Sequence, residues 1–161
     1  MLGNSFPKIS FGIEFNLNFR GWGLYVLGTG EAGVNKWANN NYYWNRAEEK
    51  YSVQALNRYH PVNNPEGVYP RLTTTTGENN FRNSTAWLLN ADFFRMKNTE
   101  FSYTLINPAV TAVTRQIKIF IRATNLFVLS SIKDLDPELL NGGVTNYPLM
   151  RSITGGVSFT F

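Results

Sequence analysis

The sequence lacks cysteine, which excludes disulfide bonds and any metal or redox site built on thiolates. It also lacks an uninterrupted apolar run of the ~18–20 residues that a transmembrane helix needs. Charged residues make up only 16% of the chain, whereas soluble domains usually have ~25%. Asparagine, threonine, glycine and aromatic residues replace the missing charge. This composition favours β-structure with polar loops.

The positive charge is modest and dispersed. The chain has 15 Lys and Arg against 11 Asp and Glu, a net charge of +4. No run of basic residues resembles the stripe with which proteins follow a phosphate backbone. Nucleic acid is therefore not an expected partner.

Strict alternation of apolar and polar residues is the clearest signal in the chain. Between Ile9 and Phe19 every odd position is apolar and every even position is polar or small. Arg20-Gly21 then predicts a tight turn into a second strand from Trp22. The same reasoning gives an all-β fold of antiparallel strands at about 9–19, 22–28, 93–105, 116–126 and 148–161.

Two long polar segments separate these strands, at about 29–92 and 127–147, with one plausible helix around 46–57. Periodicity alone fits both a soluble β-sandwich and a membrane β-barrel. Strands of ~9–11 residues, short turns alternating with long loops and a C-terminal aromatic residue favour the barrel. Five spans are too few to close a barrel, so partner strands are expected from elsewhere.

Six short blocks, in register over essentially the whole chain, resemble the C-terminal end of SusC/RagA-type TonB-linked outer-membrane proteins of Bacteroidetes. The blocks are Tyr69–Leu72, Phe94–Leu105, Thr124–Phe127, Asp136–Glu138, Asn146–Pro148 and Gly155–Phe161. The resemblance implies that residues 1–161 are the C-terminal segment of a 22-stranded outer-membrane barrel with long extracellular loops. It also implies that Met1 is an internal position or the start of a truncation.

Function and partners follow from the same resemblance. It implies part of a TonB-dependent importer of oligosaccharides or peptides in the outer membrane of a Gram-negative bacterium, not competent alone. The implied partners are the remaining barrel and plug, a SusD-like surface lipoprotein, the TonB system and outer-membrane lipid. The alternative is a stand-alone soluble β-sandwich that binds glycans.

The best candidate for ligand contact is an aromatic cluster in the first long loop: Trp37, Tyr42, Tyr43, Trp44 and Asn45. Flat rings and amides suit the apolar faces and hydroxyl rims of sugars, and also suit peptides. The competing interpretation is that the rings pack the loop. Both a ligand and a lid lipoprotein remain candidate contacts.

Four cationic residues lie on predicted strands and are candidates for lining the passage: Arg95, Lys97, Lys118 and Arg122. Arg95 and Lys97 share parity with Phe101, so the alternative for this pair is an outward position at the membrane interface. At the C-terminus, Val157, Phe159 and Phe161 resemble the signal read by the outer-membrane assembly machinery.

No catalytic constellation is visible, so an enzyme is not expected, and no cofactor is implied. The single histidine, His60, has no acid and nucleophile near it in the sequence. Asp134, Asp136 and Glu138 form a weak candidate for Ca²⁺, but the glycine expected at the sixth position of such a loop is absent. Turn formation around Pro137 is the competing interpretation.

Deleting Phe161 from the full-length parent protein should lower the amount of folded protein in the outer membrane while synthesis stays normal. The expected cause is loss of the assembly signal. Heat-modifiable migration on gels measures the folded fraction, and an unchanged yield of the folded form would contradict the prediction.

Overall fold

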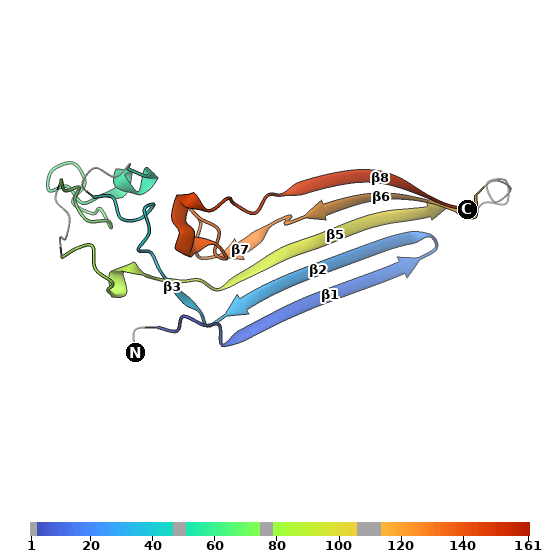
Figure 1. The fold of residues 1–161 in the computed structure, drawn as a ribbon, viewed down its shortest axis with the longest axis horizontal. Helices are drawn as coiled ribbons and strands as arrows, with labels where there is room; N and C mark the ends of the chain where they lie inside the picture. The colour runs from blue at the N-terminus through green and yellow to red at the C-terminus, as the bar shows by residue number, and fades with distance from the viewer. Residues whose placement is uncertain (1–2, 47–50, 75–78, 106–113) are drawn as a thin grey trace. The chain divides into compact units, whose positions relative to one another are not determined.

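Eight β-strands and three short 3-10 helices make up the computed structural model, which describes residues 3–46, 51–74, 79–105 and 114–161 (Figure 1). The long strands are β1 (Ile9–Phe19), β2 (Trp22–Ala32), β5 (Phe93–Leu105), β6 (Gln116–Thr124) and β8 (Ser152–Thr160). The short strands are β3 (Asn35–Trp37), β4 (Leu88–Asn90) and β7 (Val128–Ser130). The 3-10 helices are η1 (Val53–Asn57), η2 (Thr85–Trp87) and η3 (Leu140–Thr145).

The expected class, an all-β fold of antiparallel strands, is confirmed. The structure extends the second strand to Ala32, ends β6 at Thr124 and begins β8 at Ser152. The described part of the helix expected around 46–57 contains a short 3-10 helix, η1, over Val53–Asn57; residues 47–50 lie outside the described residues. Among the described residues, no helix has the length and apolar character needed to cross a membrane.

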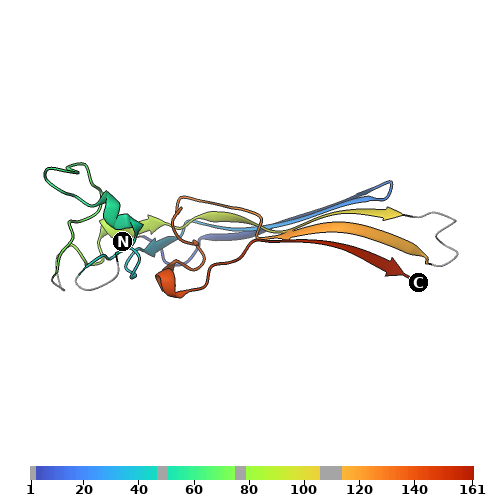
Figure 2. The same ribbon diagram turned by 90° about the horizontal axis from the view of Figure 1, so that it is seen from above.

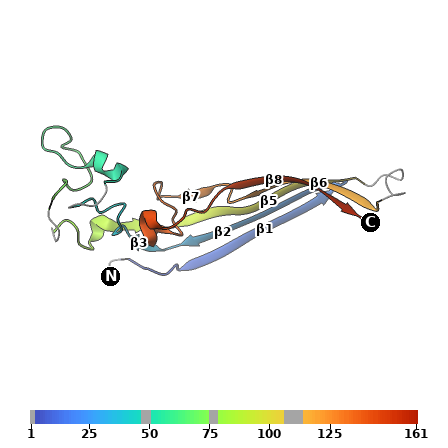
Figure 3. The same cartoon turned by 45° about the horizontal axis from the view of Figure 1, so that its top comes forward.

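The chain forms two compact units. Unit 2 comprises residues 8–32, 92–131 and 149–161 and holds a sheet with the strand order β1-β2-β5-β6-β8, to which β7 adds by pairing with β5. Figures 1 and 3 show the long strands side by side in this order, and Figure 2 shows them as one thin, curved layer. Within the described residues, β1 and β8 are the edges of this path.

Register in unit 2 brings the starts of β1 and β5 and the end of β2 together at one end of the strands. Ile9 lies opposite Ala32, and Glu31 lies opposite Phe93. The tight turn at Arg20-Gly21 lies at the other end, where Phe19 pairs with Trp22. Arg20 and Gly21 both have positive φ, 48° and 87°, the left-handed geometry of a two-residue hairpin turn.

The sheet has one apolar and one polar face. Cross-strand pairs such as Leu17 with Leu24 and Ile119 with Val157 lie on the apolar face. Phe15, Ile121 and Phe159 on this face are each about half exposed, at 50%, 58% and 55%. The apolar face therefore has no cover from the part of the chain that the structure describes.

A β-bulge in β5 changes which residues share a face. Leu27 lies opposite Asn98, but the next residue, Gly28, lies opposite Met96, so Lys97 is the extra residue. Because one residue is inserted, the apolar face of β5 is formed by even-numbered positions before Lys97, such as Phe94 and Met96. After Lys97 the same face is formed by odd-numbered positions, such as Phe101. Asn125, at φ 50°, directly follows the end of β6 beside this bulge, and its backbone amide donates to the Lys97 carbonyl at 2.9 Å.

Two glycines on β2 make room for aromatic rings on the apolar face. A Cβ at Gly28 would lie 2.5 Å from Cζ of Phe94, and one at Gly30 would lie 2.5 Å from Cζ of Phe11. The Phe11 and Phe94 rings stack with centroids 6.3 Å apart. Rings lying over strand glycines restore the packing that the missing side chains would provide.

Unit 1 comprises residues 1–7, 33–91 and 132–148 and has its own core. Its two-stranded sheet pairs β3 with β4, and Lys36 on β3 donates from Nζ to the carbonyl of Pro137 at 2.7 Å. The buried residues of the core come from all parts of the unit: Val34, Ala38, Tyr43, Phe81, Trp87, Ala91, Ile132 and Leu140. The two long polar segments thus meet in one core.

Replacing Gly30 with alanine should destabilise the sheet by about 1–3 kcal/mol, because the new Cβ would overpack the site. The Cβ would lie 2.7 Å from the Phe93 carbonyl oxygen, which belongs to the backbone and cannot rotate away. The midpoint of urea unfolding in detergent micelles measures the effect.

Gly155→Ala is the matched control, since a Cβ at Gly155 meets no atom within 4 Å. Equal midpoints for the two variants would show that the close approach at Gly30 does not limit stability.

Candidate functional site

An ion-pair network lies at the centre of the polar face of the sheet. Glu100 on β5 accepts hydrogen bonds from Nζ of Lys118 at 2.6 Å and from Nε and Nη2 of Arg122 at 2.9 and 2.5 Å. Glu100 lies directly opposite Arg122, and Lys118 lies opposite Thr104 on the same face. One carboxylate therefore holds two cations, which leaves net positive charge at this position.

An aromatic ring and a glycine extend the network towards β8. The Arg122 guanidinium lies 5.2 Å from the centroid of the Phe120 ring, within range of a cation–π contact. A Cβ at Gly156 would lie 2.5 Å from Cζ of Phe120, so the ring covers this glycine. Beside the network, a hollow of about 260 Å³ is lined by polar side chains that include Asn16, Asn18, Tyr25 and Ser102.

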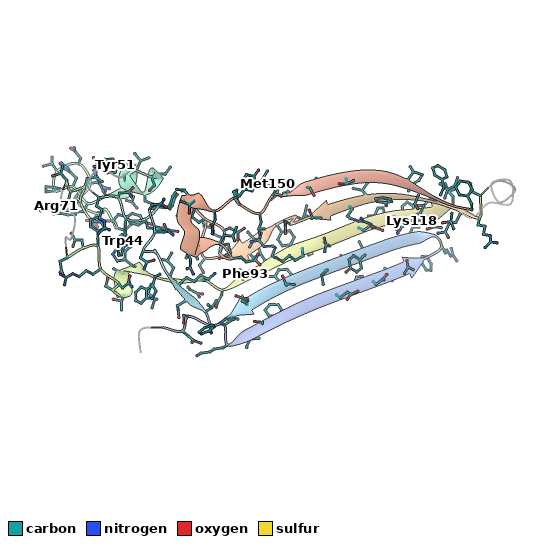
Figure 4. The ribbon with its side chains drawn as sticks, in the orientation of Figure 1. Trp44, Tyr51, Arg71, Phe93, Lys118 and Met150 are labelled. Carbon is teal, nitrogen blue, oxygen red and sulfur yellow. The ribbon has the colours of Figure 1, made fainter. Side chains whose placement is uncertain are left out.

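The bulge at Lys97 changes the positions of Arg95 and Lys97, which the sequence pattern had placed on the same face as Phe101. Arg95 lies opposite Thr29 and is 3% exposed, whereas Met96 lies opposite Gly28 on the apolar face. Counting odd and even positions along an uninterrupted strand would place Arg95 on the apolar face. Because of the bulge, Arg95 lies on the polar face. Lys97 is the bulge residue itself. Figure 4 labels Lys118 and Phe93 on this sheet.

The aromatic cluster of the first long loop lies in and around the core of unit 1. Tyr43 is buried there, and Trp37, Tyr42 and Trp44 are partly buried and pack against it. Trp44 contacts the Phe81 and Trp87 rings edge-on at centroid distances of 6.1 and 6.2 Å. Among the described residues, these rings contact other side chains of the core. Such contacts agree with the interpretation that the rings pack the loop.

Burial also sets the chemistry of two phenols in unit 1. Loss of hydration on burial raises the pKa of Tyr43 well above its ordinary value, and the negative charge of Asp134 adds to the effect. The pKa of Tyr69 is raised for the same two reasons. Both phenols therefore stay protonated to a higher pH than an exposed tyrosine does.

Asn45 anchors the end of this cluster. Its Oδ1 accepts from the backbone amide of Ser52 at 2.7 Å, and its Nδ2 donates to the Ser52 hydroxyl oxygen at 3.2 Å. The same hydroxyl donates to the Tyr42 carbonyl at 2.5 Å and caps η1 by accepting from the Gln54 amide. Since Asn45 is buried, these contacts give it a structural part in the loop.

A larger hollow, of about 810 Å³, lies elsewhere in unit 1. Its lining includes Tyr69 and Trp87, the guanidinium-bearing Arg71 and Arg82, and the amide of Asn79. Figure 4 labels Arg71 and Trp44, which belong to this unit. Apolar rings with a few polar groups are the usual lining of a ligand pocket.

Asp134 and Asp136, two of the three residues considered for Ca²⁺, use their carboxylates for different hydrogen bonds. Asp134 accepts from Nε2 of Gln54 at 2.6 Å, and Asp136 accepts from the backbone amide of Glu138 at 3.0 Å. The Lys36 ammonium binds the carbonyls of Pro137 and Glu138. Among the described residues, no group of three His, Cys, Asp or Glu side chains is arranged to hold a metal ion.

The C-terminal residues proposed as an assembly signal lie on or next to the edge strand β8. Val157 and Phe159 pair with Ile119 and Ile117 on the apolar face. Phe161 follows the last strand residue and is 79% exposed. These side chains are therefore accessible at the apolar face of the sheet.

Two sets of residues were missed by reasoning from the sequence. Glu100 was not a candidate because its role depends on how β5 and β6 pair. The alternation along β6 places Lys118 and Arg122 on one face, and this could have suggested that an acidic residue on the neighbouring strand binds them. Arg71, Arg82 and Trp87 come together only through the fold of unit 1, and no local pattern signals that.

These features define the class: an antiparallel sheet of the kind that makes up a large β-barrel, with one exposed apolar face. The chain is similar over 99% of its length to a structure of the RagAB peptide importer in the 'closed-closed' state (TM-score 0.76, 24% identity). It is also similar, over the same share, to the 'open-open' state of that importer (TM-score 0.70, 21% identity) and to the RagAB peptide transporter (TM-score 0.75, 25% identity).

The chain spans 18% of the length of these matched chains. The resemblance to SusC/RagA-type proteins is thereby confirmed at the level of the fold. No family model matches the sequence, and no curated protein matches it.

Glu100→Gln should destabilise the sheet by about 1 kcal/mol, because charge-assisted hydrogen bonds to partly exposed cations are discounted by solvent screening. Lys118 and Arg122 are 38% and 53% exposed. The urea midpoint measures the loss. Glu14→Gln, on exposed β1, removes the same charge and should change little; an equal loss would mean that net charge, not the network, is responsible.

Proposed function

We propose that the chain forms part of the barrel wall of a TonB-dependent importer in the outer membrane of a Gram-negative bacterium. The observation that carries the proposal is the exposed apolar face on strands of 9–13 residues, in a fold that matches the RagAB peptide importer over 99% of the chain. Strands of this length suit the ~25 Å apolar band of outer-membrane barrels.

The energetic argument for a membrane rests on the size of the exposed face. Fully burying a Val, Leu, Ile or Phe side chain contributes about 1.5–3 kcal/mol. With more than ten such residues each about half exposed, the unburied contribution is on the order of 10 kcal/mol, comparable to the whole stability of a domain. Lipid on this face removes that cost.

The polar face then lines the passage. The Glu100 network leaves positive charge there, with Arg95 on the same face. The rest of the barrel supplies strands that pair with the edge strands β1 and β8. Without them, the unpaired N–H and C=O groups of these edges would face lipid at a high free-energy cost. The chain alone is therefore not competent for transport.

The proposed cargo is peptides. The matched structures are of a peptide importer and transporter, and no feature of the described loops selects sugars over peptides. Oligosaccharides remain the second candidate because the half-buried rings of unit 1 suit both. The proposed partners are a SusD-like surface lipoprotein over the loops of unit 1, a plug within the barrel and the TonB system.

The stand-alone soluble sandwich finds less support. A sandwich needs a second sheet over the apolar face, packed about 10 Å away. Within the described residues, the sheet of unit 2 presents that face uncovered, and β3 and β4 form their sheet within unit 1.

Placing a lysine at Phe15 should prevent membrane insertion of the full-length protein, because a cation on the lipid face costs about 2–4 kcal/mol near the bilayer midplane. Asn16→Lys is the matched control: it places the same charge one residue away, on the polar face. Heat-modifiable protein in the outer-membrane fraction measures insertion.

Equal insertion of the two variants, or recovery of both in the soluble fraction, would reject the membrane assignment. Uptake of labelled peptide and oligosaccharide mixtures is measured in the same cells. Import of oligosaccharides alone would replace peptides as the cargo and leave the barrel assignment standing.

A further inference from the structure

The larger hollow in unit 1 carries two arginines whose charge is not used within the described structure. Arg71 and Arg82 both line it and both are exposed. Within the described residues, no hydrogen bond or ion pair engages either guanidinium. Their donors are therefore available to a ligand.

The walls around these arginines are fixed. The indole Nε1 of buried Trp87 donates to the Asn80 carbonyl at 2.8 Å, and its ring lies 6.2 Å from that of Tyr69. The backbone of Tyr69 is held on both sides, by the amide of Tyr59 at 2.7 Å and the carbonyl of Asn57 at 3.2 Å. A ligand would meet a preformed aromatic surface, which lowers the entropic cost of binding.

The charges near the hollow favour an anion. None of the described residues that line it is an aspartate or a glutamate. The negative charge of Asp134 reaches Tyr69 and disfavours a second anion beside that phenol, so the two arginines are the groups in the lining that would bind an anion. Guanidinium groups recognise carboxylates through paired N–H donors, and this geometry adds specificity as well as energy.

We propose that this hollow binds acidic peptide segments. Arg71 and Arg82 bind carboxylates, and Tyr69, whose ring packs on buried Trp87, contacts the apolar parts of the peptide. A volume of about 810 Å³ lies within the range of small-ligand sites, so it holds a short segment and not a folded protein. The asparagine side chain of Asn79 offers both a donor and an acceptor to a peptide backbone. The inference rests on the proposed peptide import and narrows its substrate class.

The test uses the full-length protein purified in detergent and two fluorescein-labelled synthetic peptides that differ only in carrying glutamate or glutamine at the same positions. Fluorescence anisotropy measures both affinities. We expect the double variant Arg71→Gln/Arg82→Gln to weaken binding of the glutamate peptide about tenfold, the equivalent of one charge-assisted hydrogen bond. Binding of the glutamine peptide should change less than about twofold, since it lacks the carboxylates.

Lys133→Gln is the matched control, because Lys133 is exposed, belongs to the same unit and does not line the hollow. It should leave both affinities unchanged, and heat-modifiable migration confirms that all variants are folded. Equal losses for both peptides, or no loss for either, would overturn the inference. So would tighter binding of a galacturonic acid oligomer than of the glutamate peptide.

The outcomes separate the inference from the proposed function. If wild-type protein binds both peptides equally, acidic selectivity is wrong and peptide import stands. If folded wild-type protein binds neither peptide, peptide import fails together with the inference.

Discussion

A single antiparallel sheet has to satisfy its backbone within the sheet while its two faces meet different surroundings. That constraint explains the strict alternation along β1 and β6, since each side chain is committed to one face by its position. It also explains why the polar residues are paired across strands: a carboxylate such as Glu100 on a shared face neutralises neighbouring cations that would otherwise repel each other.

Period-two alternation was enough to predict the sheet, and the hairpin at Arg20-Gly21 followed from it. The strand ends were harder, because β2 continues through Gly28 and Gly30, where no side chain marks the face. The rings of Phe94 and Phe11 cover these two glycines, and this contact between strands cannot be predicted from the sequence of β2. Likewise, Glu100 is an ordinary polar position of β5 until the register places it opposite Arg122.

The long polar segments were the least predictable part. Their composition indicates loops, yet they build a core around Trp87, Tyr43 and Leu140 from stretches about a hundred residues apart. Contacts such as Lys36 with the Pro137 carbonyl have no local sequence signature. The aromatic residues of the first long loop stand out in the sequence, but which of them lie in the core and which near the surface depends on tertiary packing, and the residue types do not encode it.

The extra residue at Lys97 divides β5 into two segments of opposite parity. Because of this insertion, Arg95 lies on the polar face although Phe101, six residues further on, lies on the apolar face. The pairing partners beyond the bulge keep their register. In evolutionary terms, insertion or loss of one residue here exchanges the surroundings of a whole strand end. If a related strand that lacks this residue is aligned without a gap, positions of the apolar face are matched with positions of the polar face on one side of the bulge.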